Sequence, residues 1–136
     1  VFHDDIDRGL AEYADRSFDT VILNQTLQQV RKLEEGLQEA LRVGRDVIVG
    51  FPNFAHYLSR IEIFFRGKAP VTPSLPYEWH DTPNLHFLSI SDFVDYCRRR
   101  KIKIKKSAFL GKEREIRFLP NLFAHTGIFL ISNGRD

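Results

Sequence analysis

The sequence predicts a single α/β domain over residues 1–136, with a mainly parallel sheet and a final antiparallel hairpin. Two observations predict this class. Apolar runs of strand length alternate with a segment whose apolar residues recur every three or four positions, which is the pattern of a βαβ unit. The last two runs of strand character follow one another with no helix between them, which favours an antiparallel pair.

The βαβ unit comes first along the chain. The predicted strand at 19–24 is a continuous apolar run, which is typical of a strand buried on both faces. A helix is expected over 29–42, because one helical face collects Val30, Leu33, Leu37 and Leu41. Gly44 stands where the end of a helix often needs a left-handed residue. A second buried strand is predicted at 46–51, and the crossover between the strands should be right-handed.

The segment after this unit changes character. Helical spacing of apolar residues predicts a helix over 54–66, and four prolines between 69 and 84 then exclude regular structure. We therefore interpret 54–86 as an aromatic-rich insert of the kind that forms a lid or a partner surface. The remaining predicted elements are a helix at 89–100, which begins with the capping-box pattern of Ser89 and Asp92, and strands at 101–109 and 127–132.

Composition excludes several classes of protein. The formal net charge is only +2, so no overall field directs the chain to nucleic acid or membranes. The sequence has no apolar run of membrane-spanning length and no signal-peptide pattern at its start. Cys97 is the single cysteine, which excludes an internal disulfide, and we expect a cytoplasmic protein. Because Cys97 lies on the apolar side of its predicted helix, we interpret it as a core residue.

Polar side chains follow both strands of the βαβ unit, at the edge of the sheet where α/β proteins bind ligands. Asn24 and Gln25 follow the first strand and Asn53 follows the second. Their amides could bind a polar ligand, and the alternative is that Asn24 and Asn53 only cap turns and helices. In the insert, Tyr77 and Trp79 are the candidates for recognising a substrate or partner. The alternative there is that both rings pack the insert against the domain.

Several segments carry a family resemblance. SFDTVILNQTLQQV (17–30) resembles the fourth-strand motif of S-adenosylmethionine-dependent methyltransferases, and EALRVGRDVIVGFPN (39–53) resembles the helix and strand that follow that motif. With PVTPSLPYEWHDTPNLH (70–86) and LPNLFAH (119–125), the chain is similar over nearly its whole length to MetW-type methionine biosynthesis proteins.

The resemblance implies the C-terminal part of a Rossmann-like methyltransferase fold, with S-adenosylmethionine as the cofactor. It places Asp5 and Ile6 beside the adenine, and it places Asn24, Gln25 and Leu27 along the methionine moiety. It identifies no catalytic acid or base, since Gln29 stands where many relatives have a histidine. For contacts with a substrate or partner, the candidates are Asn53, Tyr77, Trp79 and His80.

The resemblance also concerns the start of the chain. The family's glycine-rich loop and ribose-binding acid would precede Val1, so we expect a longer polypeptide whose N-terminal portion is not included here. In such folds the strand at 19–24 pairs with the strand before that loop. We therefore expect its outer edge to be covered by another segment or by a second copy in a homo-oligomer.

Three functions stay open from the sequence. The resemblance implies a protein of methionine biosynthesis that supports homoserine O-acyltransferase, with that enzyme as its partner. The second is a methyltransferase that acts on a small molecule. The third is a nucleic-acid-binding module, suggested by the basic cluster at 98–106, although a helix end followed by the exposed face of a strand explains the same charges. No histidine pair has the spacing of a zinc site, and we predict no metal.

Overall fold

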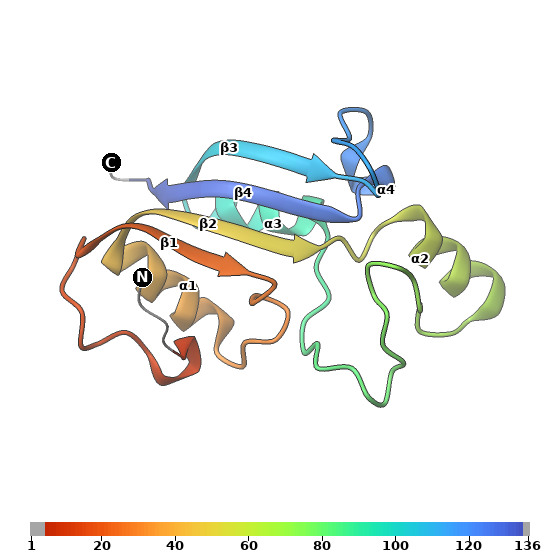
Figure 1. Ribbon diagram of the computed structural model, residues 1–136, viewed down its shortest axis with the longest axis horizontal. Helices are drawn as coiled ribbons and strands as arrows, with labels where there is room; N and C mark the ends of the chain where they lie inside the picture. Colours follow the sequence, from red (N-terminus) through yellow and green to blue (C-terminus); the bar gives the residue numbers. More distant parts are fainter. Residues whose placement is uncertain (1–4, 135–136) are drawn as a thin grey trace.

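The structure is a computed structural model, and residues 5–134 are described. Its centre is a four-stranded sheet with the order β1-β2-β4-β3 (Figure 1). The strands are β1 (Phe18–Asn24), β2 (Gly44–Pro52), β3 (Ile102–Leu110) and β4 (Thr126–Asn133). β1 and β2 are parallel and β3 and β4 are antiparallel, as predicted. Because β4 returns between β2 and β3, it is also antiparallel to β2, and the sheet is mixed.

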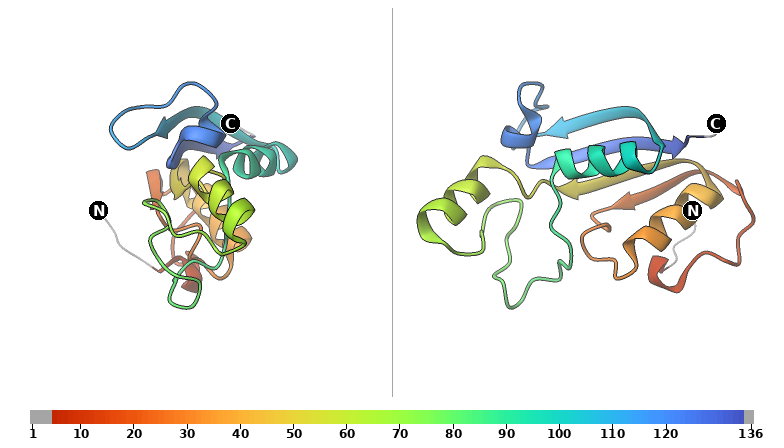
Figure 2. Two further views of the ribbon diagram at one scale, coloured as in Figure 1. Left: turned by 90° about the vertical axis from the view of Figure 1, so that its right-hand side faces the viewer. Right: turned by 180° about the vertical axis from the view of Figure 1, so that it is seen from behind.

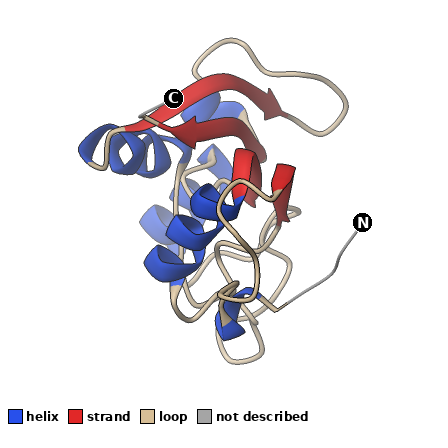
Figure 3. Cartoon of the chain, turned by 90° about the vertical axis from the view of Figure 1, so that its left-hand side faces the viewer, coloured by secondary structure: helices blue, strands red, loops and turns tan. Residues whose placement is uncertain are grey.

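Two long helices, α1 (Leu33–Val43) and α3 (Ile90–Arg99), cover the same face of the sheet (Figure 2, Figure 3). The capping box that the sequence predicts at the start of α3 is present, with reciprocal bonds between Ser89 and Asp92. The expected helix at 29–42 begins four residues late, at Leu33. The reason is a turn in which the backbone N–H groups of Gln29 and Val30 both donate to the carbonyl of Thr26.

Four shorter helical elements complete the fold: η1 (Ile6–Arg8), α2 (Tyr57–Ile61), η2 (Glu62–Arg66) and α4 (Pro120–Phe123). η2 is a single wide π-turn that continues α2 and ends at Gly67 in the left-handed conformation. These two elements occupy most of the helix predicted at 54–66. The insert then runs as irregular chain to Leu88 and projects beyond the end of β2 (Figure 1).

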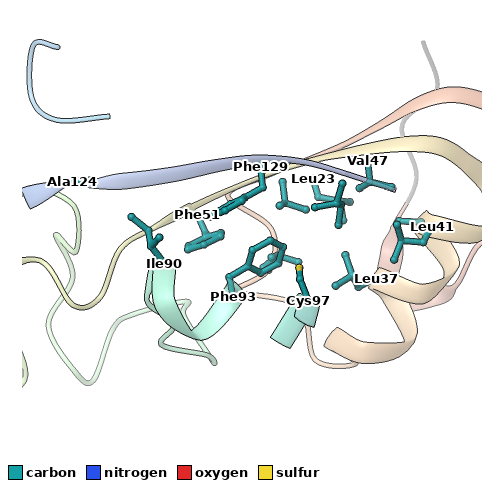
Figure 4. Close-up of a cluster of buried hydrophobic side chains, with 14 residues drawn as sticks. Leu23, Leu37, Leu41, Val47, Phe51, Ile90, Phe93, Cys97, Ala124 and Phe129 are labelled. Carbon is teal, nitrogen blue, oxygen red and sulfur yellow. The ribbon is translucent and has the colours of Figure 1, made fainter. Parts of the chain in front are cut away.

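The core lies between the sheet and the two long helices (Figure 4). α3 brings Phe93 and Cys97 against Phe51 of β2 and Phe129 of β4, and the Phe93 and Phe129 rings are 4.9 Å apart. Cys97 is fully buried, which confirms its prediction as a core residue. Burial raises the pKa of its thiol to about 12, so it is no nucleophile at neutral pH.

The outermost strand, β1, differs from the prediction. Leu23 faces the core and is 6% exposed, whereas its neighbour Ile22 is 65% exposed on the opposite face. Since α1 and α3 lie on one side, the expectation that residues 19–24 are buried on both faces is wrong for residues 5–134. Within this described range β1 pairs with β2 alone, so no second strand is paired along its outer edge.

Gly44 is required for a reason other than the predicted one. Its φ of −101° is extended rather than left-handed, so the expected left-handed helix end is wrong. A Cβ atom at this position would lie 2.7 Å from Cγ2 of Val21. The glycine therefore allows β2 to start directly against β1.

Candidate functional site

A cleft of about 350 Å³ lies at the carboxyl ends of β1 and β2, where the sequence predicts a ligand site. The sheet side of this cleft includes Gln25, Gln28 and Pro52, and the insert side includes Ser74, Pro76 and Tyr77. We call it the amide cleft. Two residues proposed from the sequence, Gln25 and Tyr77, thus meet at one site although they lie far apart in the chain.

The loop after β1 has a constrained geometry. Gln25 adopts a left-handed backbone with a φ of 54°, which costs a residue other than glycine about 1–3 kcal/mol. Its backbone N–H donates to the carbonyl of Gly50 at 2.8 Å, and this bond ties the loop to β2. Its side-chain Oε1 accepts a bond from Nε2 of Gln28 at 3.2 Å. The two amides therefore hold each other in place beside the cleft.

The end of the insert is bonded to the same loop. The carbonyl of Gln28 accepts from the backbone N–H groups of Leu85 and His86 at 2.6 and 3.0 Å. Nε2 of His86 lies 2.8 Å from the carbonyl of Val30. Sequence reasoning missed Gln28 and His86, although both lie inside the segments that carry the family resemblance. These bonds fix the insert over the cleft.

The other residues expected along the cofactor lie apart from the amide cleft. Leu27 is buried in the core, so only its backbone could face a ligand. Asn24 projects over Gly50 on the face of the sheet that the helices leave open, since a Cβ at Gly50 would lie 3.1 Å from Oδ1 of Asn24. Asp5 caps η1, and Ile6 packs against Gly36 of α1.

Asp7, which the sequence did not single out, attaches the N-terminal segment to the start of α1. Its carboxylate accepts from the backbone N–H groups of Arg31 and Lys32 at 3.0 and 3.3 Å. This bond places η1, and with it Asp5 and Ile6, beside the first turn of α1.

Asn53 has the capping role that the sequence left open as an alternative. It is fully buried, and its Nδ2 donates to the carbonyls of Asn121 and Ala124 at 3.0 Å. Its Oδ1 accepts from the backbone N–H groups of Ala55 and Ile90 at 3.3 Å. These four bonds join the end of β2 to α3 and α4, and they use both ends of the amide.

Five aromatic rings of the insert are exposed: Phe64, Phe65, Tyr77, Trp79 and Phe87. We call the three that line one pocket, Tyr77, Trp79 and Phe87, the aromatic patch. Trp79 is 78% exposed, so the alternative that it packs the insert against the domain is not what the structure shows. Tyr77, Trp79 and Phe87 line an apolar pocket of about 500 Å³. Tyr77 also lines the amide cleft, so one ring is shared by both sites. His80 is exposed and pairs with Glu78 at 3.5 Å.

Two histidines stack near the start of β4. The rings of His56 and His125 are 4.1 Å apart and 20° from parallel. Burial, and then the charge of His125, lowers the pKa of His56; burial, and then Lys112, lowers the pKa of His125. Both pKa values therefore lie below the ordinary histidine value, so the neutral form of each ring predominates at pH 7. Across residues 5–134, no group of three or more His, Cys, Asp or Glu side chains is arranged to hold a metal.

The basic cluster is partly neutralised within the domain. Arg98 pairs with Asp95, Arg100 with Glu34, and Lys105 with Asp46. These pairs favour the interpretation of the cluster as a helix end and a solvated strand face over that of a nucleic-acid surface.

Comparisons with known proteins identify the family of this chain. The profile of the family described as methionine biosynthesis protein MetW matches residues 1–131. The chain belongs to the MetW family. It is 38% identical over 129 residues to the bifunctional methionine biosynthesis protein MetXA/MetW of Rhodopirellula baltica. That alignment covers 91% of the chain but only 21% of the relative.

Among solved structures, the chain is similar to an S-adenosylmethionine-dependent methyltransferase of Thermotoga maritima, described as a possible histamine N-methyltransferase. The TM-score is 0.60 at 18% identity, over 93% of this chain and 60% of that one. A likeness at this identity shows the fold, and it confirms the methyltransferase-like α/β class. In residues 5–134 no helix is long and apolar enough to cross a membrane.

Proposed function

We propose that this MetW-family chain is the methyltransferase-like part of a cytoplasmic protein that supports homoserine O-acyltransferase in methionine biosynthesis. The observation that carries the proposal is the aromatic patch on the insert. The Rhodopirellula baltica relative supports it, because its name joins MetXA and MetW in one bifunctional protein. The partner itself comes from the family resemblance.

The aromatic patch has the physical character of a protein interface. Its three rings are exposed, and they line a pocket large enough to receive a side chain of a partner. Tryptophan and tyrosine contribute most of the binding energy at many interfaces, because a large apolar area is buried there at a small cost in conformational entropy. Trp79 and Tyr77 are therefore the expected anchors, and the exposed His80 contributes less. Asn53 is buried, so it would act only indirectly, by holding the end of β2.

A binding assay between the whole protein and homoserine O-acyltransferase tests this proposal. Replacing Trp79 by alanine should weaken the complex by about 2 kcal/mol or more, roughly 30-fold in Kd. The matched control is Phe118→Ala, because Phe118 is also highly exposed, at 73%, but lies on the loop between β3 and α4. Equal affinity of the Trp79→Ala protein and the parent, at equal stability, would contradict the proposed surface.

We further propose that the complete protein binds S-adenosylmethionine, with Asp5 and Ile6 beside the adenine and Asn24, Gln25 and Leu27 along the methionine moiety. The fold and the polar loop after β1 support this assignment, and Leu27 would take part through its backbone. When bound, the cofactor supplies an electrophilic methyl group. Asp5→Ala in the whole protein should weaken binding by about 1–3 kcal/mol in calorimetry. Unchanged binding would show that Asp5 does not contact the adenine.

A second candidate function, methyl transfer to a small molecule, is favoured by the amide cleft. This cleft adjoins Gln25 at the end of β1, and methyl transfer can proceed by proximity and alignment without a general base. Transfer of labelled methyl groups from S-adenosylmethionine to a small acceptor, in the absence of the acyltransferase, would distinguish an enzyme from an accessory subunit.

A further inference from the structure

A further cleft, of about 890 Å³, lies beside the start of β4, where α2 and the loop that joins β3 to α4 both contribute to its walls (Figure 1). We call it the histidine cleft. Five of its lining residues carry rings, and each ring contacts the next in one continuous series: Phe118, Phe123, Tyr57, His56 and His125. Neighbouring ring centroids are between 4.1 and 6.3 Å apart. None of the described lining residues also lines the amide cleft or the apolar pocket of the insert, so this is a separate site.

The inner end of this wall of rings is held by hydrogen bonds. His56 is buried, and its Nδ1 accepts from the backbone N–H of Leu58 at 3.2 Å. His125 lies against it, and the backbone N–H of His125 donates to the carbonyl of Leu110 at 2.8 Å. The two stacked rings therefore provide a fixed surface at the end of the cleft.

The outer end of the wall depends on the loop between β3 and α4. Leu119, directly before α4, has a φ of 42°, a left-handed conformation that is unfavourable for a residue other than glycine. On either side of this turn the rings of Phe118 and Phe123 stack, with their planes 22° apart. Phe118 is nevertheless 73% exposed. Strained backbone is concentrated at functional sites, and here it lies next to a large ring that is available for contact.

The histidines have the character of a binding surface rather than of an acid-base pair. Nδ1 of His125 is buried and has no hydrogen-bond partner within residues 5–134. A histidine that transfers protons usually has Nδ1 oriented by an acceptor. Neutral imidazole rings do, in contrast, offer flat faces against which another ring can pack.

The charges of the loop determine which ligands the cleft favours. Its charged lining residues are three cations and two acids: Lys112, Arg114, Arg117, Glu113 and Glu115. Glu115 pairs with Arg117 at 3.8 Å, which leaves the single acid Glu113 against two cations. Burial, and then the charge of Lys112, lowers the pKa of His125, and no acid of the described chain opposes that effect. The His125 end of the cleft is therefore positive.

We propose that the histidine cleft binds a small planar aromatic anion, whose ring stacks on the wall of rings and whose charge lies towards Lys112 and Arg114. The flat ring buries apolar area against Phe118 and Phe123, and the anionic group interacts with cations that the loop's acids only partly neutralise. This binding site is additional to the support of homoserine O-acyltransferase.

Three probes test the two parts of the ligand: benzoate, benzamide and acetate. In NMR titrations of the whole protein at neutral pH, benzoate should shift the ring signals of His125 saturably. It should bind roughly threefold more tightly than benzamide, which has no charge, because exposed ion pairs contribute little. It should bind about tenfold more tightly than acetate, which has no ring. Equal binding of benzoate and either other probe, or no saturable shift at His125, would overturn the proposal.

Two substitutions at exposed positions then locate the site. Lys112→Gln should weaken benzoate binding roughly threefold and leave benzamide binding unchanged, because it removes only a charge. The control is Lys106→Gln, since Lys106 is an exposed lysine of β3 that does not line the cleft. Phe118→Ala should weaken both aromatic probes roughly fivefold. Unchanged benzoate binding by the Lys112→Gln and Phe118→Ala proteins would show that the ligand does not lie in this cleft.

The same variants separate this site from the proposed acyltransferase surface. Trp79→Ala should weaken acyltransferase binding and leave benzoate binding unchanged, and Phe118→Ala should do the reverse. Loss of benzoate binding in the Trp79→Ala protein would contradict two separate sites. Failure of the acyltransferase to bind, with benzoate binding intact, would refute only the proposed partner.

Discussion

The two faces of the sheet carry similar residues but have different surroundings. On the face covered by α1 and α3, Leu23, Val49 and Phe129 are almost fully buried. On the open face, Ile22, Ile48 and Leu130 lie side by side across β1, β2 and β4 in the strand register. An apolar row of this kind is typical of a strand layer with cover on both sides. Within residues 5–134 the row has no covering layer, so it is the kind of surface that a further layer of structure would bury.

The strongest test of this difference uses neighbouring residues on one strand. Leu23→Ala should lower the free energy of unfolding by about 2–5 kcal/mol, because it leaves a cavity under α1. The matched change Ile22→Ala removes a similar volume from the open face, and it should change stability by less than about 0.5 kcal/mol. Urea unfolding of the chain measures both values. Similar losses for the two variants would show that the open face is covered in solution.

The covered face was the more predictable from sequence. The helical spacing of Leu37 and Leu41 and the apolar side of α3 were sufficient to place the core. The open face was not predictable, because a run such as Thr20–Leu23 is the same whether one or both faces are covered. The identity of neighbouring layers is a long-range property that a local pattern does not contain.

The residues of the candidate site also differ in how far the sequence could predict them. Gln25 and Tyr77 could be proposed because strand ends and proline-stiffened aromatics have local signatures. Gln28 could not, since its role depends on contacts with the insert about 57 residues later, at Leu85 and His86. The capping bonds of Asn53 were likewise not predictable, because they depend on carbonyls about 70 residues later, at Asn121 and Ala124.

A second prediction concerns how the helices of the covered layer are attached. Asn53→Ala leaves the buried backbone N–H of Ile90 without its side-chain acceptor and the carbonyl of Ala124 without a donor. We expect a loss of about 1–3 kcal/mol in the free energy of unfolding. The half-buried Asn84 of the insert is the control position, and Asn84→Ala should have a smaller effect. Equal losses would show that Asn53 is not the link between β2, α3 and α4.

A third prediction uses pH. In the stacked pair at the insert end of the sheet, His56 is buried and His125 is half-buried, and burial lowers the pKa of each ring. The unfolded chain therefore binds more protons than the folded chain in mildly acidic solution. The contribution of the pair is fully present above the unfolded pKa of about 6.5, and it decreases as the pH falls from there through the lowered folded values.

The measurement is the free energy of unfolding at pH 8 and at pH 5. His125→Phe removes one titrating ring and keeps a stacking partner for His56, so the loss between the two pH values should become smaller. His80→Phe is the control, because His80 is exposed beside Glu78. An unchanged pH dependence in the His125→Phe protein would contradict a neutral stacked pair.

Ile22→Lys should have the smallest effect on stability. It also tests most directly whether the open face is covered. We propose that another part of a longer polypeptide, or a second copy, covers this face and the edge of β1 that no strand of residues 5–134 pairs with. Exposed apolar strands at a free edge favour pairing between chains. The chain of residues 1–136 should therefore self-associate, and light scattering should give a mass above that of a monomer.

Ile22→Lys places a charge in the apolar row and should reduce this association, with a change in stability of less than about 0.5 kcal/mol. Thr20→Lys is the matched control, because Thr20 lies on the same face of β1 and its replacement adds the same charge without removing an apolar side chain. If both variants dissociate equally, net charge rather than the apolar row governs association. A monodisperse monomer that unfolds cooperatively with Ile22 still exposed would show that the sheet is stable with two layers, and the proposal of a third would then be wrong.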